Sequence, residues 1–340
     1  MSRRGDRTTL VAALAALLLA APAPSAADGP LRPGQGVTVR PAATEVREER
    51  FQTLIVERAL QALGYRIAPP TLYDYQTMHL ALGSGQADFA AVHWEPLHDG
   101  FFAQAGGAST LRRLGVLIDG AVQGYVVDKA SFDAGVTNLA DLRDPAIARR
   151  FDRDGDGKAD LVGCPRGWGC NLVIEHHLDA YGLRATVAHD DRPHAQAIAS
   201  VLEAEDAGRP LLFYTWTPYW VSGALPQGEA TEWLETPFPT TPDGGSFRAR
   251  HDGRMLGWPV SRLRIVANRA FLEANPAAAA LFEVASIPIE DISAQNILMF
   301  EGARADSDIE AHAEAWIAAN EPAFNAWLAA ARTAAENASR

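Results

Sequence analysis

The sequence predicts an α/β fold of two lobes with a ligand cleft between them. Apolar, β-branched segments alternate with helix-patterned segments through most of the 340 residues, which is typical of α/β domains. The length favours two domains over one, yet no internal repeat or long low-complexity linker divides the chain. Two lobes connected by strands that cross between them fit both observations, and the cleft between such lobes is a usual small-ligand site.

Strands and helices alternate in the first part of the chain. The apolar pattern predicts strands at residues 37–40, 65–68 and 87–94 and helices at residues 51–63 and 75–83. Gly64 ends the first helix. The buried strand at 87–94 ends at Trp94, and functional residues tend to gather at strand ends in such sheets.

A second α/β unit follows. Strands are predicted at residues 124–127, 161–163, 186–188 and 210–214, and helices at 139–151, 171–181, 194–205 and shortly after Thr217-Pro218. A loop-like stretch rich in Pro, Gly, Thr and Asp covers 237–257, before a strand at 263–266 and helical patterns that include 277–285, 292–300 and 306–334. We therefore assign residues 28–122 plus 258–340 to lobe 1 and residues 123–257 to lobe 2.

Residues 1–27 have the pattern of a secretory signal peptide. Three arginines are followed by an apolar run from Leu10 to Ala21 and by small residues up to Ala27, where cleavage is expected. The apolar run is short for a membrane span, and no later stretch reaches about 18 apolar residues. These features predict a periplasmic protein that is not inserted in a membrane.

The charge excludes several classes of partner. The formal net charge of the chain is −12, and removing the arginine-rich signal peptide makes it more negative. Nucleic acid and anionic membrane surfaces are therefore poor partners. Charged residues make up 21% and hydrophobic residues 48% of the chain, which argues against disorder.

The two cysteines, Cys164 and Cys170, bracket a tryptophan in Cys-Pro-Arg-Gly-Trp-Gly-Cys. In an exported chain, two cysteines this close most simply form one disulfide. Such a small ring removes little entropy from the unfolded chain. Two interpretations of this disulfide stay open: it only tightens a loop, or it closes a ring that holds Trp168 and its neighbouring amides rigid.

Three tryptophans stand at predicted strand ends or constrained turns: Trp94, Trp168 and Trp216. Core packing is the default for any single tryptophan, and we keep it for Trp233, Trp258, Trp316 and Trp327. Several indole faces around one space attract a quaternary ammonium through cation–π contacts. The amides of Gly169 and Cys170 lie just before the predicted helix at 171–181, where free amides bind anions well. His98 could donate a hydrogen bond to a carboxylate bound there. Together these parts predict a zwitterionic ligand, although His98 alone could equally serve in capping or packing.

These motifs resemble a known family. Trp-Glu-Pro-Leu-His, Gly-Trp-Gly-Cys and Tyr-Thr-Trp-Thr-Pro-Tyr-Trp are similar to those of the ProX family, the periplasmic glycine betaine and proline betaine binding proteins of osmoprotectant ABC importers. The resemblance covers essentially the whole chain after the signal peptide. It implies a type II periplasmic binding protein with Trp94, Trp168 and Trp216 in a cage. It also implies that His98 and the amides of Gly169 and Cys170 bind the carboxylate, and that Cys164 bonds to Cys170.

The resemblance also implies partners. A monomeric binding protein would deliver its ligand to an ABC permease in the inner membrane, which a separate ATPase powers. No catalysis and no cofactor are implied. Choline or carnitine is the alternative ligand, and Arg166 in the ring departs from the smaller or uncharged residue expected there, which leaves the ranking of ligands open.

Residues 152–160 resemble a calcium loop. Asp152, Asp154, Asp156 and Asp160 occupy loop positions 1, 3, 5 and 9, with Gly157 at position 6. Position 12 is Gly163 instead of the bidentate glutamate. A tight Asp/Gly turn is the simpler interpretation, and a structural calcium ion is the other.

Three rival functions are weaker. His98 and a Cys170 thiol could form a nucleophilic pair, but a disulfide removes the thiolate. A metal-transport site is disfavoured because His176 and His177 are adjacent on one predicted helix and point in different directions. We expect these two histidines, His189 and His194 to face solvent. No coiled-coil or low-complexity segment indicates a protein-interaction module.

Overall fold

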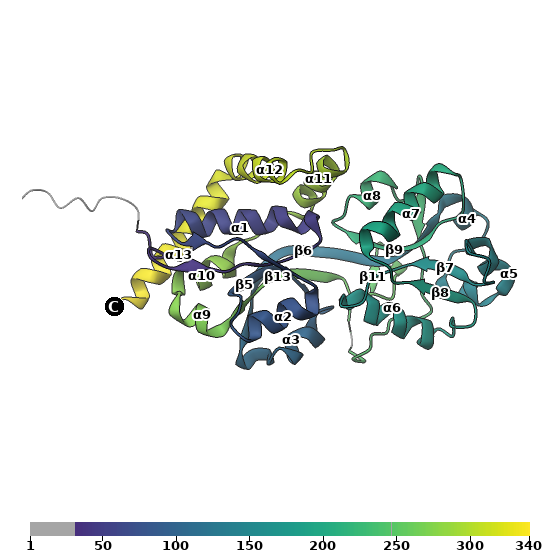
Figure 1. Cartoon of the computed structure of the whole chain (residues 1–340), viewed down its shortest axis with the longest axis horizontal. Helices are drawn as coiled ribbons and strands as arrows, with labels where there is room; N and C mark the ends of the chain where they lie inside the picture. The colour runs from purple at the N-terminus through teal and green to yellow at the C-terminus, as the bar shows by residue number, and fades with distance from the viewer. Residues whose placement is uncertain (1–30, 246) are drawn as a thin grey trace, which may run out of the picture. The chain divides into compact units, whose positions relative to one another are not determined.

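A computed structural model describes residues 31–245 and 247–340, and residues 32–340 form one compact unit (Figure 1). The predicted signal peptide at residues 1–27 lies outside the described residues. The central sheet has the strand order β5-β13-β6-β9-β7-β8, with β10 paired to β6. Its strands are β5 (Phe89–Glu95), β6 (Leu111–Asp128), β7 (Ala159–Val162), β8 (Val187–Asp190), β9 (Leu212–Thr217), β10 (Thr231–Trp233) and β13 (Ser261–Asn268).

The long strand β6 joins two groups of strands. Its first part, up to Ala121, pairs antiparallel with β13, and its second part, from Val122, pairs antiparallel with β9. Strand β13 pairs with β5 on its other edge. In Figure 1, β6 and β13 run side by side through the middle of the molecule. This is the crossing-strand connection that the absence of a linker predicted.

The prediction for β6 was too short, because it covered only residues 124–127 of an 18-residue strand. Two glycines with positive φ, Gly115 and Gly120, interrupt the apolar pattern. At Gly115 a Cβ atom would lie 2.6 Å from the backbone oxygen of Phe282. Only glycine fits this bend, and a bend inside a strand hides the strand's length from pattern reading.

Helices cover the first group of strands. Their bounds are α1 (Arg50–Ala62), α2 (Tyr75–Gly83), α3 (Asp99–Gln104), α9 (Arg269–Ala274), α10 (Pro276–Val284), α11 (Ile289–Phe300), α12 (Asp306–Ala319) and α13 (Glu321–Ala338). Two small parallel pairs lie beside them, β1 (Thr38–Val39) with β3 (Arg66–Ile67) and β2 (Ala42–Thr44) with β4 (Thr71–Tyr73). Helix α1 buries its apolar face and is followed by Gly64 at φ +96°, as predicted. Asp74 caps α2 by accepting from the amide of Thr77.

The second group of strands carries α4 (Lys129–Asp133), α5 (Pro145–Ala148), α6 (Gly169–Ala180), α7 (His194–Asp206) and α8 (Val221–Ala224). The single helix predicted at 139–151 is wrong. Asp144 is extended at ψ 117° and caps α5, and Pro145 has no N–H to continue a helix. The loop at 237–257 contains a short hairpin of β11 (Arg250–His251) and β12 (Arg254–Met255).

One further boundary differs. The helical pattern predicted over 306–334 is two helices, because α12 ends at Ala319 and α13 begins at Glu321, with Pro322 in its first turn. The four tryptophans assigned to the core are all at most 9% exposed, which confirms that assignment.

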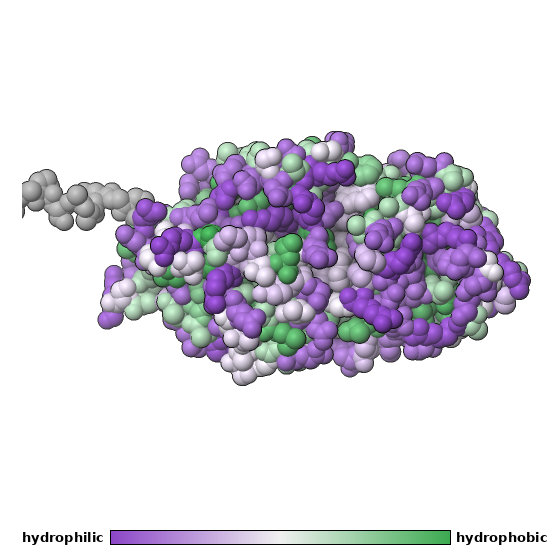
Figure 2. Space-filling view, in the orientation of Figure 1, coloured by the Kyte–Doolittle hydropathy of each residue, from purple (hydrophilic) through white to green (hydrophobic). Residues whose placement is uncertain are grey.

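Figure 2 shows hydrophilic residues over most of the visible face, with hydrophobic ones in small patches. Within residues 31–245 and 247–340, no helix is both long and apolar enough to cross a membrane.

Candidate functional site

All six residues predicted to bind the ligand line one pocket, at the place where the two groups of strands meet. The space between its atoms is about 280 Å³, part of it open to solvent. The lining residues are Tyr75, Trp94, Leu97, His98, Gln123, Trp168, Gly169, Cys170, Tyr214 and Trp216. They come from α2, the end of β5 and the turn after it, β6, the start of α6, and β9.

Aromatic rings form most of the pocket wall. The rings of Trp168 and Trp216 lie 6.1 Å apart at 68°, and Tyr75 meets Trp168 edge-on at 5.3 Å. Behind them, Tyr219 stacks on Trp216 with ring centroids 4.1 Å apart. Trp94 and Trp216 are only 5% and 6% exposed. Rigid indole and phenol rings around a small space can hold a cation that has no N–H groups.

The turn after β5 places His98 against Trp94. The amide of Trp94 donates to His98 Nδ1 at 3.2 Å, and the amide of His98 donates to the Trp94 carbonyl at 2.7 Å. Because Nδ1 accepts this bond, a neutral His98 carries its proton on Nε2. Burial lowers the pKa of His98 well below its usual value, so the ring is neutral at pH 7. His98 therefore offers one N–H donor.

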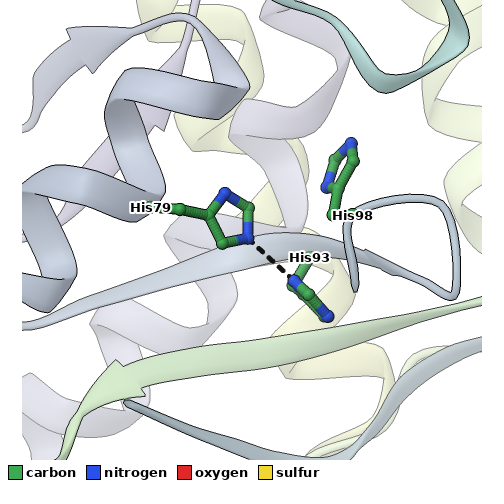
Figure 3. Close-up of side chains that lie close together, drawn as sticks. All are labelled: His79, His93 and His98. Atoms are coloured by element: carbon green, nitrogen blue, oxygen red, sulfur yellow. Dashed lines mark hydrogen bonds between the residues drawn. The ribbon is translucent and has the colours of Figure 1, made fainter. Parts of the chain in front are cut away.

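Two further histidines pack beneath His98 (Figure 3). His79 donates from Nδ1 to the carbonyl of Tyr75 at 2.6 Å, so its Nε2 accepts from His93 Nδ1 at 2.8 Å. Burial lowers the pKa of both rings, to about 4 for His79. One ring nitrogen from each of the three histidines lies within 4.8 Å of the other two, and histidine nitrogens are ligands that suit zinc. His79 and His93 are already bonded to each other and His98 to Trp94, so the cluster is better described as a neutral support for His98.

The start of α6 supplies two more donors. Helix α6 begins at Gly169, two residues earlier than predicted, with Trp168 at the N-cap position and no side-chain cap. The first amides of a helix have no partner within the helix, and in the described part of the chain nothing accepts from those of Gly169 and Cys170. A Cβ atom on Gly169 would lie 2.9 Å from Leu97 Cγ and 3.1 Å from His98 Cδ2. Glycine is therefore required for these amides to approach His98 closely.

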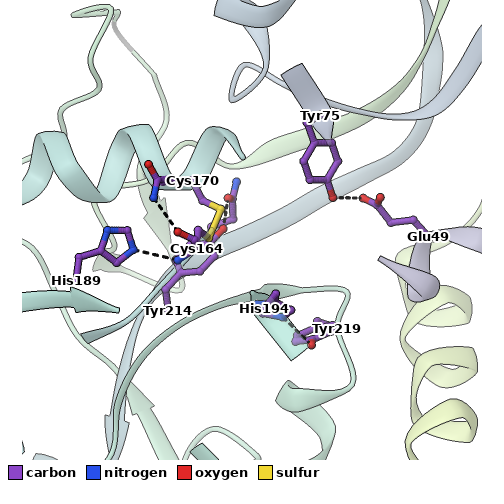
Figure 4. The surroundings of a disulfide bond; sticks show 10 residues. Glu49, Tyr75, Cys164, Cys170, His189, His194, Tyr214 and Tyr219 are labelled. Atoms are coloured by element: carbon purple, nitrogen blue, oxygen red, sulfur yellow. Dashed lines mark hydrogen bonds between the residues drawn. A yellow bond between two sulfur atoms is a disulfide. The ribbon is translucent and has the colours of Figure 1, made fainter. Parts of the chain in front are cut away.

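The predicted disulfide between Cys164 and Cys170 is present, and it removes the thiol that a nucleophilic pair with His98 would need (Figure 4). The Cys164 end of the ring is also held by hydrogen bonds. Asn171 Nδ2 donates to the Cys164 carbonyl at 2.8 Å, and the Cys164 amide donates to His189 Nε2 at 3.1 Å. These bonds favour the interpretation that the ring positions Trp168 and the two amides.

Arg166 points away from the pocket. Its side chain is 88% exposed and pairs with Asp191 at 2.9 Å, and it does not line the pocket. Its charge is therefore partly neutralised at the surface.

Sequence reasoning missed several residues of the pocket and its surroundings. Tyr75 had no motif to mark it, and Leu97 and Tyr214 belong to the quoted motifs but were given no part in the site. Tyr214 donates to Gln123 at 2.6 Å, and Gln123 donates to Ser261 of β13 at 3.0 Å, which ties β9, β6 and β13 together at the pocket. Glu49, a buried carboxylate bonded to Trp94 and Tyr75, could have been noticed as an acidic residue just before an apolar helix.

The prediction that four histidines face solvent was wrong. His177 is fully buried and bonds to Tyr125 and to the carbonyl of Thr240, and His176 is partly buried against Thr240. His189 supports the disulfide ring. His194 lies behind the pocket, with ring centroids 5.2 Å from both Trp168 and Trp216. Helix and strand positions alone did not reveal these contacts, because they are long-range.

The acidic loop brings three of its four predicted ligands together. Carboxylate oxygens of Asp152, Asp154 and Asp156 lie within 4.8 Å of one another. Each also accepts a backbone amide of the loop, as in a tight Asp/Gly turn. Asp160 is outside this group, because its carboxylate accepts the amide of Arg153 at 2.6 Å. The predicted set of four is therefore not assembled, and calcium binding by the other three stays a prediction.

Comparison with known proteins agrees with this geometry. The family model described as the substrate binding domain of ABC-type glycine betaine transport systems matches residues 37–319. The glycine betaine/proline betaine-binding periplasmic protein of Escherichia coli (strain K12) is 45% identical over 298 residues, which cover 87% of this chain and 90% of that protein. The protein of the same description from Salmonella typhimurium is 42% identical over 325 residues, 95% of this chain and 97% of the other.

A solved structure is similar in fold. Lactococcal OpuAC, in a closed conformation complexed with glycine betaine, aligns with a TM-score of 0.65 at 18% identity, covering 86% of this chain and 99% of that one. The predicted two-lobed, type II periplasmic binding protein fold is confirmed. By its sequence and fold, this chain belongs to the family of substrate-binding domains of ABC-type glycine betaine transport systems.

Proposed function

We propose that this protein captures glycine betaine, and also proline betaine, in the periplasm and delivers it to an ABC permease for osmoprotection. The observation that carries the proposal is the division of one pocket into two chemical halves. Aromatic rings, among them Trp94, Trp168 and Trp216, form one half, where a trimethylammonium group would be held by cation–π contacts. The other half offers N–H donors from His98, Gly169 and Cys170 to a carboxylate.

The family supports this role. The relatives of this chain are described as periplasmic proteins that bind glycine betaine and proline betaine. Substrate-binding proteins of such importers transfer their ligand and do not transform it, so we assign no catalytic residue. The permease and its ATPase are separate chains in this proposal, and the binding protein acts as a monomer after cleavage near Ala27.

We further propose that residues 28–122 plus 258–340 and residues 123–257 act as two lobes that close around the ligand. The pairing of β6 first with β13 and then with β9 supports this division, as does the pocket lining, which takes residues from both proposed lobes. Closure would exclude water, which strengthens the attraction between a cation and the aromatic rings.

Isothermal titration of the ligand-stripped protein with glycine betaine, choline and proline tests the proposal. We expect saturable binding of glycine betaine and much weaker binding of choline, because choline has no carboxylate for the His98 end of the pocket. Proline has N–H groups and no methylated nitrogen, so we expect it to bind least. Choline or carnitine binding more tightly than glycine betaine would favour the alternative ligand class, and no heat with any betaine would refute the proposal.

A further inference from the structure

Glu49 is a buried carboxylate just behind the pocket wall, and the proposed function gives it no role. It ends the 3₁₀ turn Arg47–Glu49 that precedes α1, and it is 8% exposed. Its Oε1 accepts from the Tyr75 hydroxyl at 2.9 Å and from Trp94 Nε1 at 3.0 Å, and its Oε2 accepts from the Thr44 hydroxyl at 2.6 Å. Figure 4 shows the bond to Tyr75. Two of these three donors line the pocket.

Hydrogen bonds to an anion do two things to an aromatic ring. They fix its orientation, because the N–H or O–H must point at the carboxylate. They also polarise the donor, so electron density moves toward the ring, and a more electron-rich face attracts a cation more strongly. Glu49 makes both bonds with the same oxygen atom, and so it couples the orientation of Trp94 on β5 to that of Tyr75 on α2.

No basic side chain of the described residues forms an ion pair with Glu49. The nearby arginines are engaged elsewhere: Arg50 pairs with Glu57 at 2.7 Å and Arg47 with Asp306 at 2.7 Å. The remaining charged groups around this place are acidic, namely Glu48, Glu45 and Glu310. A cation in the pocket would therefore be the counter-charge that the protein itself does not supply.

Glu49 can exchange protons with solvent without passing through the ligand pocket. Together with Thr44, Arg47 and Arg50 it lines a second and larger cavity, of about 980 Å³ including space open to solvent. A carboxylate at the boundary of two cavities can respond both to the pH outside and to the ligand inside.

We propose that ionised Glu49 is the positioning and charge-selecting residue of this pocket, which makes it prefer a cationic head group over a neutral head group of the same shape. The inference rests on the proposed function and deepens it, because it concerns how the same pocket selects its ligand. The cage rings supply the shape, and Glu49 supplies the charge.

The ionisation of Glu49 makes binding depend on pH. Burial raises the pKa of Glu49 to about 7 in spite of its three donors. A cationic ligand stabilises the ionised form, so affinity is highest above pH 7, falls as the carboxylate is protonated, and binding near pH 7 releases protons. The neighbouring His79 and His98 do not account for such a change, because burial keeps both neutral at this pH. Tyr75 also stays neutral, because burial raises its pKa well above the usual value.

The test compares two ligands of one shape across pH. Glycine betaine has the head (CH₃)₃N⁺, and 3,3-dimethylbutanoate has the neutral head (CH₃)₃C on the same CH₂COO⁻ tail. Dissociation constants of both would be measured by calorimetry from pH 5.5 to 8.5 for the wild-type protein, Glu49→Gln and Glu45→Gln. Glutamine keeps an oxygen for Trp94 and Tyr75 and turns its amide to the Thr44 hydroxyl, which can accept. Glu45 is exposed and lines the second cavity, so it is the matched control.

We expect Glu49→Gln to lower the preference for glycine betaine over 3,3-dimethylbutanoate about tenfold at pH 8 and to flatten the pH profile. Glu45→Gln should keep the wild-type preference and profile. Equal weakening of both ligands in Glu49→Gln, or an unchanged pH profile, would overturn the proposal and leave Glu49 a purely structural group. A wild-type protein that binds no betaine would instead refute the proposed function, and this proposal with it.

Thr44→Val provides a second, independent test of the proposal if Glu49→Gln does not fold. This variant removes the 2.6 Å donor to the ionised carboxylate, so the pKa of Glu49 should rise. Betaine affinity should then begin to fall at a higher pH than in the wild-type protein. A profile that moves to lower pH or does not move would contradict a role for the Glu49 charge.

Discussion

At the scale of single residues, the three tryptophans of the proposed cage are held by different means. Trp94 donates its indole N–H to Glu49, and Trp216 stacks on Tyr219. Trp168 contacts the rings of Tyr75, His194 and Trp216, and its side chain forms no hydrogen bond with the described residues. Truncating Trp168 therefore leaves no buried polar partner behind, whereas truncating Trp94 would leave Glu49 without one of its donors.

We expect Trp168→Ala to weaken glycine betaine binding by about 1 to 2 kcal/mol or more, the size of a desolvated cation–π contact. Calorimetric titration measures the change, which corresponds to roughly 5-fold to 30-fold in the dissociation constant. Trp316→Ala, which removes an indole that stacks on Trp327 and does not line the pocket, should lower thermal stability and leave the affinity unchanged. Unchanged affinity in Trp168→Ala would remove this residue from the cage.

At the scale of elements, the anion end of the pocket depends on how closely the start of α6 approaches the turn after β5. We expect Gly169→Ala to weaken glycine betaine binding at least tenfold, because its Cβ would lie 3.1 Å from the Leu97 carbonyl and 2.9 Å from Leu97 Cγ. The helix start must then move away from His98. Choline, which has no carboxylate, should lose less affinity than glycine betaine.

Gly100→Ala is the matched control for this prediction. A Cβ at Gly100, in α3, would meet nothing within 4 Å, and alanine is the better helix residue. We expect wild-type affinity and equal or slightly higher stability from this variant. Equal losses of betaine and choline affinity in Gly169→Ala would show that the substitution deforms the whole pocket instead of its anion end.

The acidic loop before the disulfide ring is a second element with a testable role. Asp152, Asp154 and Asp156 converge, and carboxylates that converge are the ligands that calcium prefers. If the loop binds calcium, millimolar calcium should raise the melting temperature, and Asp154→Asn should abolish the increase. Scanning calorimetry with and without chelator distinguishes the two interpretations, because no shift and no heat of calcium binding would leave the loop a tight turn.

At the scale of the whole molecule, buried histidines link folding to pH. Burial lowers the pKa of His79, His177 and His194 to about 4, whereas an unfolded histidine titrates near 6.5. Between these values the unfolded chain binds more protons, so stability is lost as pH falls through this range. Glu49 has the opposite sign, because its folded pKa of about 7 exceeds the unfolded value and favours the folded state at low pH.

Burial also lowers the pKa of His93 and His98, so the buried histidines outweigh Glu49, and we expect the melting temperature to fall by roughly 5 to 10 °C between pH 7 and pH 5. His177→Gln should reduce this pH dependence, because His177 is fully buried. His251→Gln, whose side chain is 42% exposed, should leave it unchanged. Equal stability at both pH values, measured by scanning calorimetry, would contradict the assignment of neutral buried histidines.

Local patterns in the sequence determined much of this protein. The limits of α1, α2 and α7 follow from apolar spacing and from terminal residues such as Gly64, because these signals act within one or two turns of helix. The six residues that we propose to bind the ligand, all of which line the pocket, were also predicted from sequence, because strand ends, a short disulfide ring and a helix start are all local features. The limits of strands such as β6 were harder to predict from the sequence, since strand pairing depends on residues far away in the chain.

Only the tertiary structure decided which groups surround those six residues. Glu49 lies 45 positions before Trp94 and His194 lies 26 positions after Trp168 in the sequence, yet each contacts its tryptophan. The protonation states of Glu49, His98 and the buried histidines follow from desolvation, which depends on packing and not on neighbouring residues in the chain. The sequence by itself thus determined the kind of ligand site. The ionisation of Glu49 and the tautomers of the histidines behind the pocket wall depend instead on contacts that exist only in the folded molecule.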